Sequence, residues 1–149
     1  MNILTNAQNT LNHINQVING NGLTLDANNV TSFTVDENII CLFCVLEEEQ
    51  TLVVTLYLGR VEETNAALLH EILCGNYMGA YTAGGTLGID AEENLLALHH
   101  HFPLPIEEPA WIEEQLAGLI GAAQYWRDKL QASAAPITAP SGPMAGIRV

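Results

Sequence analysis

The fold of this chain is set by residues 30–58, which read VTSFTVDENIICLFCVLEEEQTLVVTLYL. Three runs in this stretch are rich in β-branched and aromatic residues, and polar clusters at 36–38 and 47–50 separate them. Such runs joined by short polar loops are typical of neighbouring antiparallel strands. The stretch therefore predicts a three-stranded meander, with strands at residues 30–35, 39–46 and 52–58.

Short turns also fix how these strands pair, because successive side chains of a strand alternate between two faces. A turn at 36–38 places Val35 opposite Ile39, and a turn at 47–50 places Leu46 opposite Thr51. One face then carries large apolar residues at Phe33, Val35, Ile39, Cys41, Phe43, Val45, Leu52, Val54, Leu56 and Leu58. The other face carries Ser32, Thr34, Ile40, Leu42, Cys44, Leu46, Val53, Thr55 and Tyr57. It is still half apolar, although a single antiparallel sheet normally leaves that side to water. We therefore expect something to cover it.

Three helices are predicted around this meander. Apolar residues recur at three- and four-residue steps over 3–18, the pattern of an amphipathic helix. A second helix is predicted at 62–75, with Glu62 and Glu63 in its first turn, where the helix dipole favours acids. The last begins near Pro109, a residue that suits a first helical position, and runs to 131.

A second hairpin and a tail complete the predicted organisation. The runs at 84–89 and 95–102 predict two short strands. After residue 131 the chain consists mainly of small residues and prolines, a composition that does not repay ordering. We predict one α+β domain at 1–131, ordered helix, meander, helix, hairpin, helix, with the helices packed on one side of a twisted antiparallel sheet. Residues 132–149 are predicted to be a flexible tail.

The charge of the chain argues against several partners. Among 149 residues there are 4 Lys+Arg against 17 Asp+Glu, a formal net charge of −13. This balance repels nucleic acid and anionic membranes. The longest apolar run, residues 39–46, falls far short of the ~20 residues of a membrane-spanning helix. We therefore expect no nucleic-acid partner and no membrane insertion. The 3 cysteines and the lack of signal-peptide features in the first residues favour a reduced, cytosolic protein.

The candidate catalytic and metal-binding residues form no convincing set. Cys41 and Cys44 have metal-site spacing, but strand positions three apart point to opposite faces. His99 and His101 would share a strand face, yet two imidazoles without a third ligand make a weak site. The glycine-rich stretch at 79–88 lacks the lysine of a phosphate-binding loop. We expect no enzyme activity, no metal and no cofactor.

Three local stretches resemble the Tir-chaperone family of type III secretion chaperones. They are residues 22–26 leading to 30–36, residues 68–76 running into 84–90, and residues 124–130. The most specific piece is Gly-Thr-Leu-Gly-Ile-Asp at 85–90. The resemblance covers roughly 1–131. It implies a homodimer in the bacterial cytoplasm that binds, without ATP, the non-globular amino-terminal segment of a virulence-associated secreted effector. It also implies that the chaperone keeps this segment soluble and presents it to the export apparatus.

The resemblance also implies where the partners bind. In this family the second helix and neighbouring strands usually build the dimer, and the first helix and first sheet usually hold the effector. The implied dimer residues are Leu68, Leu69, Ile72, Leu73, Leu87 and Ile89. The implied effector-binding residues are Ile40, Leu42, Leu46, Val53 and Tyr57.

Other functions remain open at this point. The same fold could serve a regulatory or adaptor protein without a secretion partner. An acidic surface could also imitate nucleic acid, but mimicry predicts charges along one face, whereas these acids cluster at predicted turns and helix starts. A small metal-dependent protein using His99, His101 and a cysteine is the last alternative.

Overall fold

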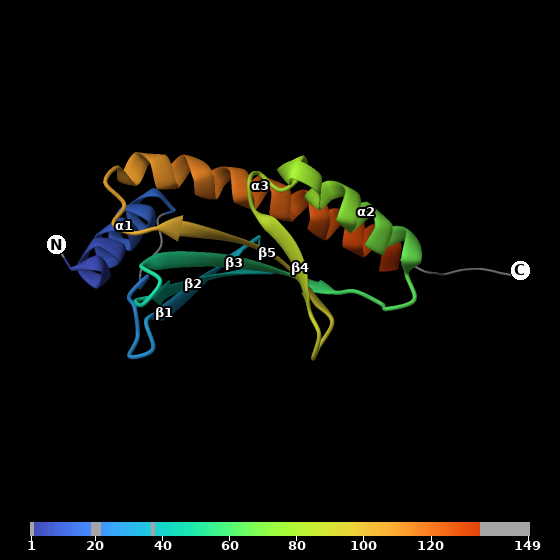
Figure 1. Cartoon of the computed structure of the whole chain (residues 1–149), viewed down its shortest axis with the longest axis horizontal. Helices are drawn as coiled ribbons and strands as arrows, with labels where there is room; N and C mark the ends of the chain where they lie inside the picture. Colours follow the sequence, from blue (N-terminus) through green and yellow to red (C-terminus); the bar gives the residue numbers. More distant parts are fainter. Residues whose placement is uncertain (1, 19–21, 37, 135–149) are drawn as a thin grey trace, which may run out of the picture.

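The computed structural model describes residues 2–18, 22–36 and 38–134. It contains a five-stranded sheet in the order β1-β2-β3-β5-β4, in which every neighbouring pair is antiparallel. The elements are α1 (Ile3–Val17), β1 (Val30–Val35), β2 (Ile39–Leu46), β3 (Thr51–Arg60), α2 (Ala66–Asn76), the 3-10 turn η1 (Tyr77–Gly79), β4 (Thr86–Asp90), β5 (Leu95–Pro103) and α3 (Pro109–Ala134). All three helices lie on one side of the sheet (Figure 1). The predicted α+β class and layer arrangement are confirmed.

The register of the meander agrees with the prediction. Val35 pairs with Ile39 across the first turn, and Leu46 pairs with Thr51 across the second. The ladder between β3 and β5 is interrupted between Tyr57 and Gly59, where the register shifts. Gly59 adopts a φ of +139°, a conformation that side-chain-bearing residues rarely adopt. The irregularity therefore sits where the chain supplies a glycine.

The core lies between the sheet and the long helix α3. The predicted core face is buried along β2 and β3, where Cys41, Phe43 and Leu52 are fully buried. Burial raises the pKa of the Cys41 thiol to about 12. Helix α3 packs against this face with buried apolar residues at three- and four-residue spacing: Ile112, Leu116, Leu119, Ala123, Trp126 and Leu130. The two layers thereby bury each other's apolar sides.

Two asparagine side chains connect the shorter helices, α1 and α2, to the rest of the fold through hydrogen bonds. Asn6 of α1 donates to the carbonyl of Ile106 at 2.8 Å and accepts from its N–H at 2.7 Å. Asn76, at the end of α2, does the same with Leu87 of β4, both at 2.8 Å. Each amide therefore satisfies both backbone groups of one residue, as a neighbouring strand would.

The predicted boundaries need two corrections. The second helix begins at Ala66 instead of residue 62, because the Asn65 side chain caps it by accepting from the N–H of Leu68 at 3.1 Å. Glu62 and Glu63 lie in the preceding connection, not in the first helical turn. The last helix begins at Pro109, as predicted, but continues to Ala134, so residues 132–134 are helical. The remainder of the predicted tail, 135–149, lies outside the described residues.

Candidate functional site: an uncovered sheet face

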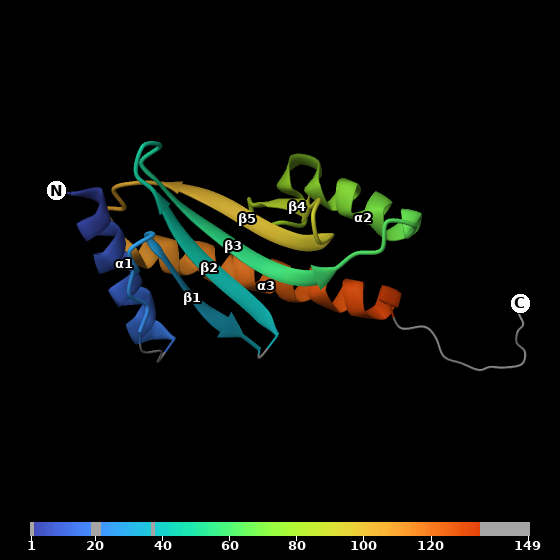
Figure 2. The ribbon, with the colours of Figure 1, turned by 90° about the horizontal axis from the view of Figure 1, so that it is seen from below.

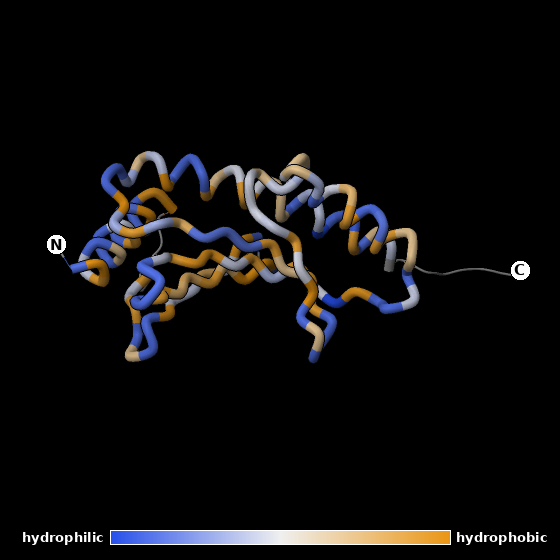
Figure 3. The backbone as a smooth tube through the Cα atoms, viewed as in Figure 1, coloured by the Kyte–Doolittle hydropathy of each residue, from blue (hydrophilic) through white to orange (hydrophobic). Residues whose placement is uncertain are grey.

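The face of the sheet that points away from the helices has no covering layer within the described residues. We call it the outer face, and Figure 2 views the molecule from that side, with α3 behind the strands. Its central part consists of Ile40, Leu42, Cys44, Leu46, Val53, Thr55 and Tyr57. Ile40 is 49% exposed, and the other six are half-buried. Figure 3 shows that hydrophobic residues run along these central strands, whereas the turns at the ends of the sheet are hydrophilic.

The strand pairing brings the predicted effector-binding residues together. Ile40 lies opposite Tyr57, and Leu42 lies opposite Thr55 on the next row. Cys44 and Val53 form the third row, and Leu46 begins the fourth. Side chains in such rows are close enough to contact one ligand. The five residues therefore share one continuous surface, and their binding role stays a prediction.

The histidine tract continues this face toward β4. His99 pairs with Thr55 on one side and Thr86 on the other, and His101 pairs with Val53. The two imidazole rings lie on the same face, as predicted, with their centroids 5.7 Å apart. Cys41 is buried on the opposite face from Cys44, so the two thiols point apart. In the part of the chain that the structure describes, no three His, Cys, Asp or Glu residues gather as a metal site.

Burial lowers the pKa of His99 below its usual 6.5, and the neighbouring His101 and His100 lower it further. The unfolded chain then binds a proton more readily than the folded one. The stability that His99 contributes is therefore full above about pH 6.5 and is lost as the pH falls toward the lower folded-state pKa. We expect His99→Gln to show a smaller fall in melting temperature than the wild type between about pH 7.5 and about pH 5.5.

Thermal unfolding followed by circular dichroism at both pH values tests this expectation. Thr55→Ser alters the same row without removing a titrating group, so it should keep the wild-type pH dependence. An unchanged pH dependence in His99→Gln would contradict the assignment.

The predicted dimer residues divide into two groups. Leu68, Ile72 and Leu87 are buried in the core of their own subunit. Leu73 is 70% exposed and Ile89 is 39% exposed, while Leu69 is half-buried. Only Leu69, Leu73 and Ile89 can therefore offer substantial surface to a second copy, and their role stays a prediction.

Most of an exposed apolar cluster near the end of α2 was missed by the sequence reasoning: Leu73 was a predicted dimer residue, but Tyr77, Met78 and Tyr81 were not predicted to have a role. We call Leu73, Tyr77, Met78 and Tyr81 the α2-end patch. Tyr77, Met78 and Tyr81 are 74%, 87% and 61% exposed, which is unusual for such large side chains. Tyr81 also stacks on Tyr125 of α3, with ring centroids 6.3 Å apart. The available signal was the presence of two Tyr residues and one Met residue within five positions, 77–81, where the glycine-rich stretch begins.

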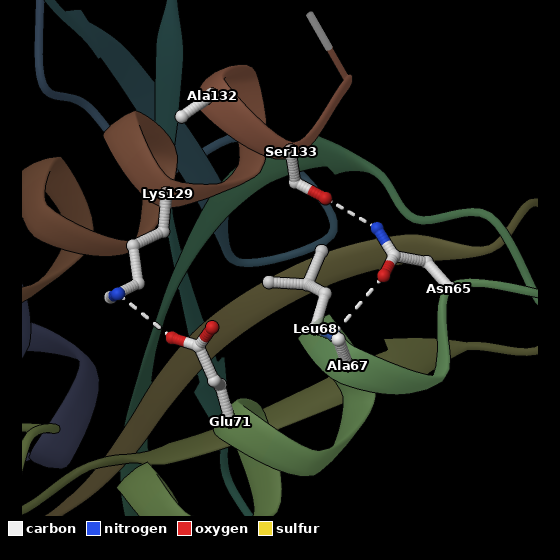
Figure 4. Close-up of a pocket in the computed structure, with 7 residues that line it drawn as sticks. All are labelled: Asn65, Ala67, Leu68, Glu71, Lys129, Ala132 and Ser133. Carbon is white, nitrogen blue, oxygen red and sulfur yellow. Dashed lines mark hydrogen bonds and ion pairs between the residues drawn. The ribbon is translucent and has the colours of Figure 1, made fainter. Parts of the chain in front are cut away.

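A cavity of about 340 Å³ lies between the start of α2 and the end of α3 (Figure 4). The Nζ of Lys129 lies 2.8 Å from Oε2 of Glu71. The hydrogen bond from Lys129 to Glu71 and the negative charge of Glu71 raise the pKa of Lys129, and Tyr125 adds a smaller contribution. At the other end Asn65 donates a hydrogen bond to Ser133. These polar groups pair with one another across the cavity. We therefore interpret the cavity as part of the packing contact between α2 and α3 and not as a ligand site.

Comparison with known proteins identifies the family to which this chain belongs. A family model described as Tir chaperone protein (CesT) family matches residues 9–127. The chain therefore belongs to that family. No curated protein sequence matches it.

Three solved structures of similar fold share 16–18% of their sequence with this chain. A chain of the ExsC-ExsE complex is 18% identical, with a TM-score of 0.75 over 87% of this chain and 97% of that one. A chain of the HopA1-SchA chaperone-effector complex is 16% identical, with a TM-score of 0.70 over 84% and 95%. A chain of the ExoU-SpcU complex from the Pseudomonas aeruginosa type III secretion system is 16% identical, with a TM-score of 0.63 over 84% and 98%. At these identities the likeness establishes the fold. Within the described residues, no helix is long and apolar enough to cross a membrane.

Proposed function

We propose that this protein is a cytoplasmic, non-enzymatic chaperone of type III secretion. It binds the non-globular amino-terminal segment of a secreted effector, keeps it soluble without ATP, and presents it for export. The observation that carries this proposal is the half-apolar outer face, which the subunit's own helices leave uncovered. Family membership and the chaperone-effector complexes among the similar structures support it.

The geometry suits an extended guest better than a folded one. Successive rows of the outer face, from Ile40 and Tyr57 to Leu46, offer apolar contacts at the spacing of a strand. Strand β1 is also an edge of the sheet, and no described strand pairs with its second side. One part of a guest segment can therefore add backbone hydrogen bonds at this edge while another part contacts the outer face. A globular partner would have no need of the free edge.

Co-expression tests this function directly. The chain is produced with the amino-terminal regions of type III effectors from its own source, each tagged, and with the same effectors lacking those regions. We expect stable co-purification of one or a few amino-terminal regions and no capture of the truncated proteins. Equal capture of both forms, or of neither, would overturn the proposal. A partner bound only through a folded domain would favour the adaptor alternative.

We also propose a homodimer that uses the α2-end patch together with Ile89. A chain of 16.1 kDa should then scatter light as a particle of about twice that mass. The double variant Leu73→Glu and Met78→Glu should scatter as a single chain, because like charges would face each other across a twofold interface. Size-exclusion chromatography with light scattering measures both masses.

Val17→Glu is the matched control, since Val17 is 48% exposed on the distant helix α1. It should retain the doubled mass. A wild-type protein of single-chain mass at micromolar concentration would contradict the dimer.

A further inference from the structure

A basin of about 460 Å³ lies at one end of the outer face. The β1–β2 turn, the irregular part of β3, and the β4–β5 hairpin meet there, and α3 contributes one side chain. The lining residues are Asn38, Ile40, Tyr57, Gly59, Asp90, Glu93, Leu95 and Arg127. Four segments far apart in sequence thus form one hollow that opens onto the proposed guest-binding surface.

The apolar part of the basin is suited to an aliphatic chain. Ile40 is 49% exposed, and Tyr57 and Leu95 are half-buried. Gly59 contributes backbone to the basin, since a Cβ at this position would point toward Leu130 of α3 and not into the hollow. A long unbranched side chain can therefore lie along this surface.

The charged part of the basin carries unpaired acids. In the described portion of the chain, neither Asp90 nor Glu93 forms an ion pair; the pairs found are Lys129 with Glu71 and His13 with Glu113. Arg127 also lines the basin but makes no ion pair with either acid, because its guanidinium donates to backbone carbonyls. Its Nη1 donates to Asn38 at 3.0 Å and to Leu58 at 2.7 Å. Two carboxylates and one cation held by backbone carbonyls thus line the basin, which leaves it a formal charge of −1.

We propose that this basin binds a lysine or arginine side chain of the guest segment. The inference deepens the proposed function and rests on it. The aliphatic stem packs on Ile40 and Leu95, the charged head meets Asp90 and Glu93, and the Tyr57 ring offers its face to the cation. The net charge of −13 further attracts basic segments to the surface. The basin therefore selects guests that carry a basic residue beside their apolar ones.

Small probes test the basin without knowledge of the effector. The backbone amide signals of Asn38, Gly59 and Glu93 are followed by NMR while the full chain is titrated with N-acetyl-arginine methylamide. We expect saturable shifts with a millimolar dissociation constant, the range of a single side-chain contact. The uncharged citrulline and norleucine analogues should bind at least about threefold more weakly, and the double variant Asp90→Asn and Glu93→Gln should weaken arginine binding by about three- to tenfold. Asp90→Asn keeps the oxygen that accepts from the N–H of Glu92, so the hairpin turn is retained.

Several outcomes would overturn the inference. They are equal binding of arginine and citrulline analogues, tighter binding of N-acetyl-glutamate methylamide through Arg127, absence of saturable shifts, or unchanged arginine binding in the double variant. The co-expression experiment separates this failure from that of the proposed function. If an effector segment co-purifies but the arginine probe does not bind, only the basin assignment is wrong. If the probe binds but no effector segment is captured, the chaperone proposal fails instead.

Discussion

Replacement of Gly75 by alanine is expected to lower the free energy of unfolding by about 2 kcal/mol. Gly75 lies in α2 directly against the indole of Trp126 on α3, and an added Cβ would meet Cζ2 of that ring at 2.2 Å. Overpacking of this kind typically costs about 1–3 kcal/mol. The indole cannot move freely, because its Nε1 donates to the carbonyl of Tyr81 at 2.8 Å, and loss of that bond costs about 1 kcal/mol more. These costs exceed the gain of about 1 kcal/mol that alanine brings to a helix.

Chemical denaturation of Gly75→Ala and Gly121→Ala measures this difference. Gly121 is the matched control, since it lies in α3 and its added Cβ would have no neighbour within 4 Å. Gly121→Ala should therefore be stabilising, by about 0.5–1 kcal/mol. If both variants were stabilised equally, the close approach of α2 to α3 at Gly75 would be wrong.

Aspartate at Leu42 or Tyr57 is expected to weaken binding of an effector segment by about 30-fold or more. Both residues are half-buried on the outer face. A guest laid across this face would bury the new carboxylate without a partner, and it would also lose apolar contact. An interface residue of this kind typically contributes about 2 kcal/mol or more, and each 1.4 kcal/mol corresponds to a factor of 10. Isothermal titration of the co-purified segment measures the change.

The matched control is Ala117→Asp, which adds the same charge on the exposed side of α3, in the helix layer. It should bind the segment as the wild type does. Circular dichroism confirms that each variant remains folded. Undiminished binding by folded Leu42→Asp and Tyr57→Asp would place the effector elsewhere on the chain.

The meander could be predicted from the sequence because two independent signals agree there. Alternating side chains assign each residue a face, and short loops leave only one register that aligns the apolar sets, so the pairings of Val35 and Leu46 follow. The start of α2 was harder to predict. Glu62 and Glu63 have the charge that favours a first helical turn, but Asn65 is also a good N-cap residue. In the structure Asn65 is the N-cap, so the helix begins after both acids.

The candidate site was predictable in its strands but not in its connections. Ile40, Leu42 and Tyr57 follow from alternation alone. The α2-end patch depends on local geometry that no period reveals: Met78 has a positive φ of 57°, and the turn leaves it 87% exposed. The basin depends on the side chain of Arg127, which extends from α3 to the carbonyls of Asn38 and Leu58. These residues are 89 and 69 positions away from Arg127 in the sequence. Long-range contacts of single side chains carry no sequence pattern.

The paired amides of Asn6 and Asn76 make the protein sensitive to chemical ageing. Deamidation would exchange each NH₂ group for a carboxylate oxygen of nearly the same shape. That oxygen would face the carbonyl of Ile106 or Leu87, where a donor now sits. The hydrogen bond from the amide to the carbonyl would be replaced by repulsion between two oxygen atoms where the helix is attached. A loss of one amide nitrogen would therefore weaken the attachment of α1 to the loop that leads into α3, or of α2 to the edge strand β4.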